Sequence, residues 1–153
     1  MSPLETLANL AIWGARNTAY NLTFIGDDKL DWKPAPTAKS ALEIVNHVAL
    51  AVRSMEPVLR GGEHSPAQFT HAVNLQEAQT LLVTSAEEYA AALREVQRED
   101  FTRQVTVWGR LTLPLLRAAT MPVVDLVHHH GQIAYLQTLL GDEEMHFDPA
   151  MAG

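Results

Sequence analysis

The sequence of 153 residues contains no cysteine. This absence excludes disulfide bonds, thiolate nucleophiles and cysteine-ligated zinc sites, so histidines and carboxylates are the remaining candidates for metal ligands. Proteins of the reducing cytosol are commonly free of disulfides, and we therefore expect a cytoplasmic location.

Basic residues are few and form no cluster. Lysine and arginine total 11 against 18 aspartates and glutamates, which gives a formal net charge of −7. A chain of this charge is a poor partner for a phosphate backbone, so we expect no binding to nucleic acid.

Long apolar runs are also missing. The N-terminal apolar stretch follows no basic segment and is interrupted by Glu5 and Asn9, which is not typical of a signal peptide. No uncharged apolar stretch reaches the roughly 18 residues that span a bilayer, so we expect no membrane partner. Hydrophobic residues make up 47% of the chain, which is enough to bury the core of one domain over residues 1–153.

Four segments have the apolar periodicity of amphipathic helices. We expect the first over about residues 3–24, with Ser2 as its N-cap. The second begins at a capping box formed by Ser40 and Glu43 and continues to about Leu59.

The third and fourth helices follow a long polar connector. The third is expected over about residues 75–98, with Asn74 or Thr70 as its N-cap. The final helix is expected to begin at Thr120, which precedes a proline-containing first turn, and to end before Gly141.

The segment between these two helices is different in pattern. Residues 101–114 alternate apolar and polar side chains around Trp108 and Gly109, which predicts a short hairpin or an extended excursion. A helical turn is expected over residues 115–119, and the acidic tail, residues 141–153, is expected to be loose. Four amphipathic helices in one small domain favour an all-α four-helix bundle.

Three consecutive histidines lie in the final helix, and helical spacing gives them different roles. His128 is expected to face solvent, whereas His129 and His130 lie on opposite shoulders of the apolar stripe. Asp125 precedes His129 by one turn, the i, i+4 spacing at which a helix presents two ligands to one metal. Gln132 follows His129 by three residues and is a candidate to hold it or to contact a substrate.

A third ligand must come from another helix, and His47 is the best candidate. Its neighbours at helical spacing are apolar, which predicts a buried imidazole that needs a partner. Two interpretations stay open at this point. His47, Asp125 and His129 either form a metal site or form a hydrogen-bonded cluster at the edge of the core.

Other side chains are weaker candidates. Trp13 and Asn17 share a face of the first helix and are candidates to line a pocket. Packing in the core or anchoring a loop is the more common role of a large aromatic residue, and this applies also to Trp32 and Trp108. The remaining histidines lie in predicted loops and are expected at the solvated surface: His64, His71 and His146.

The order of these motifs resembles the DinB superfamily, which includes DinB-like and YfiT-like metal-dependent hydrolases and thiol-dependent transferases. Residues 30–49, LDWKPAPTAKSALEIVNHVA, resemble that family's tryptophan-proline loop and the helix with its first ligand histidine. Residues 126–141, LVHHHGQIAYLQTLLG, resemble its closing helix, where a His-His-Arg-Gly-Gln run leads into an apolar stretch.

The resemblance implies a four-helix bundle, commonly a homodimer, with three metal ligands near one end and nickel or zinc as the metal. His47 matches the first ligand, and His129 matches the second histidine of the closing pair. Asp125 matches the ligand four residues earlier, which is most often histidine and is glutamate in some thiol-dependent isomerases. His130 stands where the family has arginine, so it keeps a donor but lacks the fixed charge. We expect it to support the edge of the core or to contact a metal ligand or the pocket.

The combined expectation is a metal-dependent enzyme, either a hydrolase or a thiol S-transferase, that acts on a small-molecule substrate. Because the chain has no cysteine, a thiol cofactor would be an external low-molecular-weight thiol. The alternative is a non-catalytic helical bundle that binds a metal or small ligand, in which the histidines and aspartate form a structural cluster.

Overall fold

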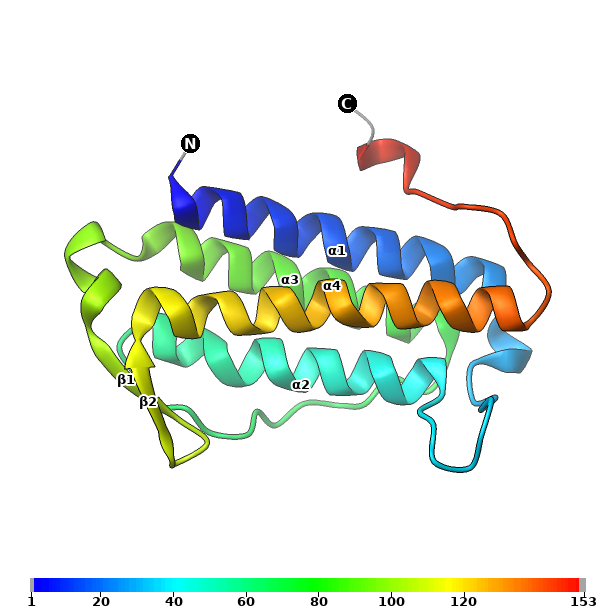
Figure 1. The fold of residues 1–153 in the computed structure, drawn as a ribbon, viewed down its shortest axis with the longest axis horizontal. Coiled ribbons are helices and arrows are strands. Elements are labelled where there is room, and N and C mark those ends of the chain that lie inside the picture. Colours follow the sequence, from blue (N-terminus) through cyan, green and yellow to red (C-terminus); the bar gives the residue numbers. More distant parts are fainter. Residues whose placement is uncertain (1, 152–153) are drawn as a thin grey trace.

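The computed structural model describes residues 2–151, in which four long helices pack side by side (Figure 1). The helices are α1 (Pro3–Ile25), α2 (Ala41–Leu59), α3 (Leu75–Glu95) and α4 (Leu115–Leu139). α1 and α2 each pack against both α3 and α4. Met1 and residues 152–153 of the predicted domain lie outside the described residues. No helix among residues 2–151 is both long enough and apolar enough to cross a membrane.

Local hydrogen bonds set the starts of the first three helices. The Ser2 hydroxyl accepts from the backbone N–H of Glu5 at 3.1 Å. Ser40 and Glu43 form the predicted capping box, and the Asn74 side chain accepts from the third residue of α3 at 2.9 Å. Each bond satisfies a backbone donor that the first helical turn leaves free, so these predicted caps are confirmed.

The predicted start of the last helix is wrong. α4 begins at Leu115, and the Thr120 hydroxyl donates to a carbonyl of the same helix at 2.7 Å instead of capping it. Pro122 lies in the helix interior, where a proline leaves one carbonyl without its helical donor. Packing against α3 supports this stretch, because the buried Tyr89 hydroxyl donates to the Ala119 carbonyl at 2.9 Å.

A two-stranded antiparallel hairpin connects α3 to α4, which is one of the two predicted arrangements. β1 (Gln104–Val107) pairs with β2 (Leu111–Pro114). α3 ends at Glu95, earlier than the predicted residue 98, and a short 3₁₀ helix (Arg98–Thr102) follows. Two further 3₁₀ helices lie outside this connection, at Asp27–Lys29 and Pro149–Met151.

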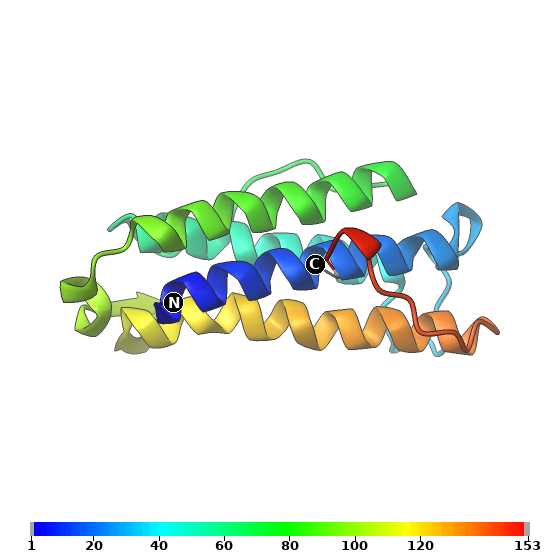
Figure 2. The same ribbon diagram turned by 90° about the horizontal axis from the view of Figure 1, so that it is seen from above.

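The connection between α2 and α3 runs back along α2 instead of making a tight turn (Figure 1). Ala67 donates its N–H to the Ser54 hydroxyl at 3.0 Å, and Asn46 makes two hydrogen bonds to the backbone of Ala72. The connection returns the chain to the end where α2 began. α2 and α3 therefore run in one direction, and α1 and α4 run in the other (Figures 1 and 2).

The described part of the tail after α4, which was expected to be loose, folds back toward α1 (Figure 1). Gln137 donates to the Glu144 carbonyl at 2.9 Å, and the Asn17 side chain accepts from the backbone N–H of Asp148 at 2.9 Å. Asn17 and Asp148 are far apart in the sequence, and no local pattern indicates their pairing.

Close packing of α1 on α4 determines which face of α4 is free for chemistry. A Cβ atom added to Gly14 would lie 2.3 Å from Cδ2 of Leu126, so a larger residue at this position would require the Leu126 side chain to shift. Because Leu126 is directed at α1, the adjacent face of α4, which carries Asp125 and His129, is directed toward α2.

Candidate metal centre

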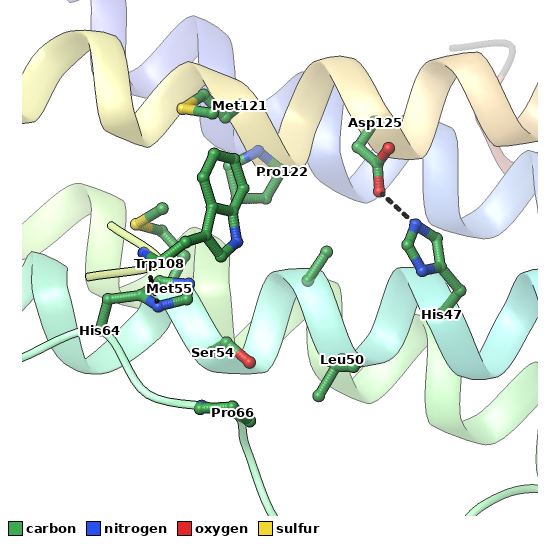
Figure 3. A pocket seen from close by; sticks show the side chains of 11 residues that line it. His47, Leu50, Ser54, Met55, His64, Pro66, Trp108, Met121, Pro122 and Asp125 are labelled. Carbon is green, nitrogen blue, oxygen red and sulfur yellow. Dashed lines mark hydrogen bonds and ion pairs between the residues drawn. The ribbon is translucent and has the colours of Figure 1, made fainter. Parts of the chain in front are cut away.

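Two helices bring the three candidate ligands together. α2 supplies His47 and α4 supplies Asp125 and His129, and one ligand atom from each lies within 4.8 Å of the other two. Nε2 of His129 lies 3.4 Å from Oδ1 of Asp125. Nε2 of His47 lies 3.6 Å from Oδ2 of Asp125, across the gap between the helices (Figure 3). The pair predicted from helical spacing and the partner predicted on α2 therefore meet in space.

The three side chains differ in exposure. The side chain of His129 is 8% exposed and that of Asp125 is 32% exposed. The side chain of His47 is 43% exposed, which corrects the expectation of a buried imidazole. The cluster thus has one deeply placed histidine and one open side through which a ligand can reach it.

Gln132 determines the orientation of His129. Its Oε1 lies 2.6 Å from Nδ1 of His129, and its Nε2 lies 3.0 Å from Nε2 of His128. Because an amide oxygen only accepts, Nδ1 of His129 carries the proton, and in the neutral ring Nε2 keeps its lone pair. Nε2 is the atom that faces Asp125, so Gln132 selects the tautomer that a metal ligand requires.

Asp125 has an unsatisfied oxygen. Its Oδ2 is buried and has no hydrogen-bond partner among the described residues. The separations of 3.4 and 3.6 Å to the two histidines are long for hydrogen bonds. They match the roughly 3–4 Å between ligand atoms that bind one ion at about 2.1 Å. Two imidazoles and one carboxylate therefore fit a divalent transition metal.

The charges of the three groups are coupled. Burial lowers the pKa of His47 and outweighs the opposing charge of Asp125. Burial also acts to lower the pKa of His129, but the interactions with Asp125 and Gln132 outweigh burial and raise this pKa. Burial of Asp125 opposes its ionisation, but the interactions with His129, His47 and His128 together outweigh burial and lower the pKa of the carboxyl. His129 is therefore the ligand at which a proton competes most strongly with a metal.

The cluster lies at one end of a pocket of about 390 Å³. α2, α4, the hairpin and the connection between α2 and α3 supply its walls (Figure 3). Asp125 is the only carboxylate among the described lining residues, and no lysine or arginine is among them. The walls are mainly apolar and include Leu50, Ala51, Met55, Met121 and Pro122.

The pocket does not include Trp13, Asn17 or His130, contrary to the expectation for the first two. Nε2 of His130 lies 2.9 Å from Oδ1 of Asn21 on α1, and the ring of Trp13 packs edge-on against His130 at 5.5 Å. Asn17 contacts the tail. Trp13 and Asn17 of α1 and His130 of α4 therefore lie where these two helices face each other, and Trp13 and Asn17 also contact the tail.

Two pocket residues had no predicted role in a site. His64 and Trp108 were expected only as loop residues, but both line the pocket at the end away from His47 (Figure 3). Their position depends on the path of the connection along α2 and on the tip of the hairpin. His128 is exposed, as its place on the helix predicted.

The comparisons with known proteins agree with this fold. The sequence profile of the DinB superfamily matches residues 13–133. An uncharacterized protein of Bacillus subtilis, YjoA, is 24% identical over 125 residues, which cover 80% of this chain and 81% of YjoA. The crystal structure of YjoA, a DinB-like protein, matches with a TM-score of 0.76 at 23% identity over 93% of this chain and 96% of that one. A DinB-like protein from Bacillus cereus matches with a TM-score of 0.68 at 17% identity, covering 84% and 87% of the two chains.

Proposed function

Because the chain belongs to the DinB superfamily, we propose that it is a metal-dependent enzyme acting on a small molecule. His47, Asp125 and His129 would hold the metal, for which nickel or zinc is the expected ion. The observation that carries this proposal is the convergence of two imidazoles on the Asp125 carboxylate, whose buried Oδ2 has no hydrogen-bond partner, at the end of a pocket.

A bound divalent metal supplies Lewis acidity, which polarises a substrate or lowers the pKa of a bound thiol or water. The side chains of the protein prepare the site for this. Gln132 holds His129 with its lone pair toward the cluster, and the Asp125 carboxylate offsets part of the charge of the ion. The apolar walls exclude water from the substrate, and the open side at His47 gives it access.

The composition of the pocket favours thiol-dependent transfer over hydrolysis. Hydrolysis requires a base that takes a proton from water, and the lining residues among 2–151 include no carboxylate besides Asp125. His64 lies at the opposite end (Figure 3). A thiol ionises near pH 8.5, so it needs less assistance than water. The thiol would be an external low-molecular-weight one. It would lose its proton to solvent, and its sulfur would bond to the substrate carbon while the leaving group departs with the bonding electron pair.

A structural cluster without catalytic activity is the alternative function. Such a site would be closed by protein side chains on all sides. The 43% exposure of the His47 side chain and the adjoining pocket favour an enzyme.

Elemental analysis of protein purified without a histidine tag tests the metal site. We expect about one equivalent of nickel or zinc per chain after reconstitution, and less than about a tenth in His129→Ala. His71→Ala is the matched control, because His71 is an exposed loop histidine outside the cluster. A wild-type content below about a tenth of an equivalent would contradict the proposal. Equal contents in wild type and His129→Ala would exclude His129 as a ligand.

Cobalt substitution separates the two reaction types. If a thiol binds at the metal, addition of mercaptoethanol to the cobalt protein produces a new near-ultraviolet absorption band. An unchanged spectrum would favour hydrolysis.

A further inference from the structure

The backbone at the tip of the hairpin is strained. Trp108 has a φ of 52° and is the one non-glycine residue with a positive φ in the described chain. Gly109 follows with a φ of 65°, and the two strands resume with Val107 opposite Leu111. Bulky residues rarely adopt this left-handed conformation, which glycine and asparagine tolerate far better. A tryptophan at this position therefore needs a reason outside the turn.

The left-handed turn directs the indole to the pocket. In β1, Val105 and Val107 are buried whereas Thr106 is exposed. Regular alternation would place residue 108 on the same side as Thr106. Instead, the indole lies between α2 and α4 and lines the pocket (Figure 3). Trp108 is still 54% exposed there, so the strained backbone does not serve to bury it.

Three further side chains surround the indole. The ring of His64 is edge-on to it, with centroids 6.0 Å apart, and Nδ1 of His64 lies 3.4 Å from the backbone nitrogen of Trp108. Met55 of α2 and Met121 of α4 line the same part of the pocket (Figure 3). An indole and two thioethers form a polarisable surface that favours apolar and aromatic groups.

We propose that Trp108, together with Met55 and Met121, is the specificity subsite for an apolar, preferably aromatic, substituent of the substrate. This inference rests on the proposed function, since the metal-binding group of the substrate would lie at His47 and Asp125, at the other end of the pocket. The volume of about 390 Å³ is within the range of small-molecule sites and accommodates both parts of one molecule.

Two hydroxamates test the subsite in the nickel-loaded protein. Acetohydroxamate is a metal-binding group alone, and phenylbutanohydroxamate adds an aryl tail to the same group. Calorimetry should show the aryl probe binding at least about tenfold more tightly to the wild type. Trp108→Ala should abolish this preference and leave the affinity for acetohydroxamate unchanged.

Two further variants control for other effects of the substitution. Trp32→Ala is the matched control, because Trp32 is a partly exposed loop tryptophan that does not line the pocket, and it should behave as wild type. Trp108→Phe should keep most of the preference. An unfolding midpoint of Trp108→Ala no lower than that of wild type would exclude loss of the fold as the cause.

The outcomes distinguish this inference from the metal proposal. If acetohydroxamate binds but Trp108→Ala keeps the aryl preference, the subsite is excluded while the metal centre stands. If the protein holds no metal or binds neither hydroxamate, titration of the metal-free protein with phenylbutanol tests the subsite by itself. Binding that Trp108→Ala weakens about tenfold supports the subsite, and binding that it leaves unchanged overturns it.

Discussion

Asp125 directs its two carboxylate oxygens at two histidines on different helices. Oδ1 lies 3.4 Å from Nε2 of His129, one turn along α4, and Oδ2 lies 3.6 Å from Nε2 of His47 on α2. Oδ2 has no hydrogen-bond partner in the described chain. Asp125 therefore connects its helical neighbour His129 to His47 on α2, which gives a group of three candidate ligands. Catalytic zinc sites typically have three protein ligands.

Replacement of Gln132 by alanine should weaken metal binding without removing a ligand. In the wild type, Oε1 of Gln132 lies 2.6 Å from Nδ1 of His129. The variant lacks this partner, so the ring loses its fixed orientation and tautomer. We expect the affinity to fall about 10- to 100-fold, measured by competition with a chromogenic chelator. Gln76→Ala, an exposed glutamine on α3, is the control. Equal affinities in both variants would show that Gln132 does not orient the ligand.

Metal affinity should fall as the pH falls. The ligands bind as neutral imidazoles, so protons compete with the metal. Burial lowers the pKa of His47, which keeps that ring neutral further into the acid range. At His129 burial is outweighed by Asp125 and Gln132, and its pKa lies above the ordinary 6.5. His129 is thus the first ligand to take up a proton.

One competing proton reduces the affinity up to about tenfold per pH unit below the pKa of His129. Chelator competition at a series of pH values near neutrality measures this slope. An affinity that stays constant across the ordinary pKa range of histidine would contradict protonation of a ligand in the metal-free site.

Short-range patterns predicted most of the helical structure. The caps at Ser2, Ser40 and Asn74 each depend on a bond to a residue three positions away, so the sequence alone contains them. The pairing of Asp125 with His129 has the same origin, since one helical turn separates them. By contrast, Thr120 was interpreted as a helix start with Pro122 in the first turn, because the packing of this stretch against α3, including the bond from Tyr89 to Ala119, is invisible locally.

Long-range packing determined what the sequence did not predict. Trp13 and Asn17 share a face of α1, but that face meets His130 and the tail and not the pocket. Trp108 and His64 reach the pocket only because the connection after α2 and the tip of the hairpin meet there. Nothing in the spacing of these residues along the chain indicates that meeting.

Substitution of Trp108 by asparagine should preserve or increase stability. Asparagine tolerates a positive φ, so the variant relieves strain at the turn, and little burial is lost because Trp108 is 54% exposed. We expect the free energy of unfolding in urea to stay the same or to rise by up to about 1 kcal/mol. Trp32→Asn, at a position without a positive φ, should show no such gain. A loss above about 1 kcal/mol would mean that the indole serves the fold.

Replacement of Tyr89 by phenylalanine should destabilise the protein at neutral pH. The buried hydroxyl donates to the Ala119 carbonyl at 2.9 Å, and removing it leaves that interaction unmade. We expect a loss of about 1 kcal/mol in the free energy of unfolding. Tyr135→Phe is the control, because Tyr135 is 64% exposed on α4 and should lose nothing measurable.

At alkaline pH, Tyr89→Phe should become more stable than the wild type. Burial raises the pKa of Tyr89 far above its ordinary value of 10.0, so the folded protein keeps the phenolic proton at pH values where the unfolded chain loses it. The wild type therefore keeps the full contribution of this group below pH 10.0 and loses it progressively above that value. Phenylalanine has no proton to lose, so the stability deficit of Tyr89→Phe should shrink and then change sign as the pH rises past 10.0. Urea unfolding of both proteins on either side of that pH measures the crossing, and parallel stability curves would contradict a buried, neutral Tyr89.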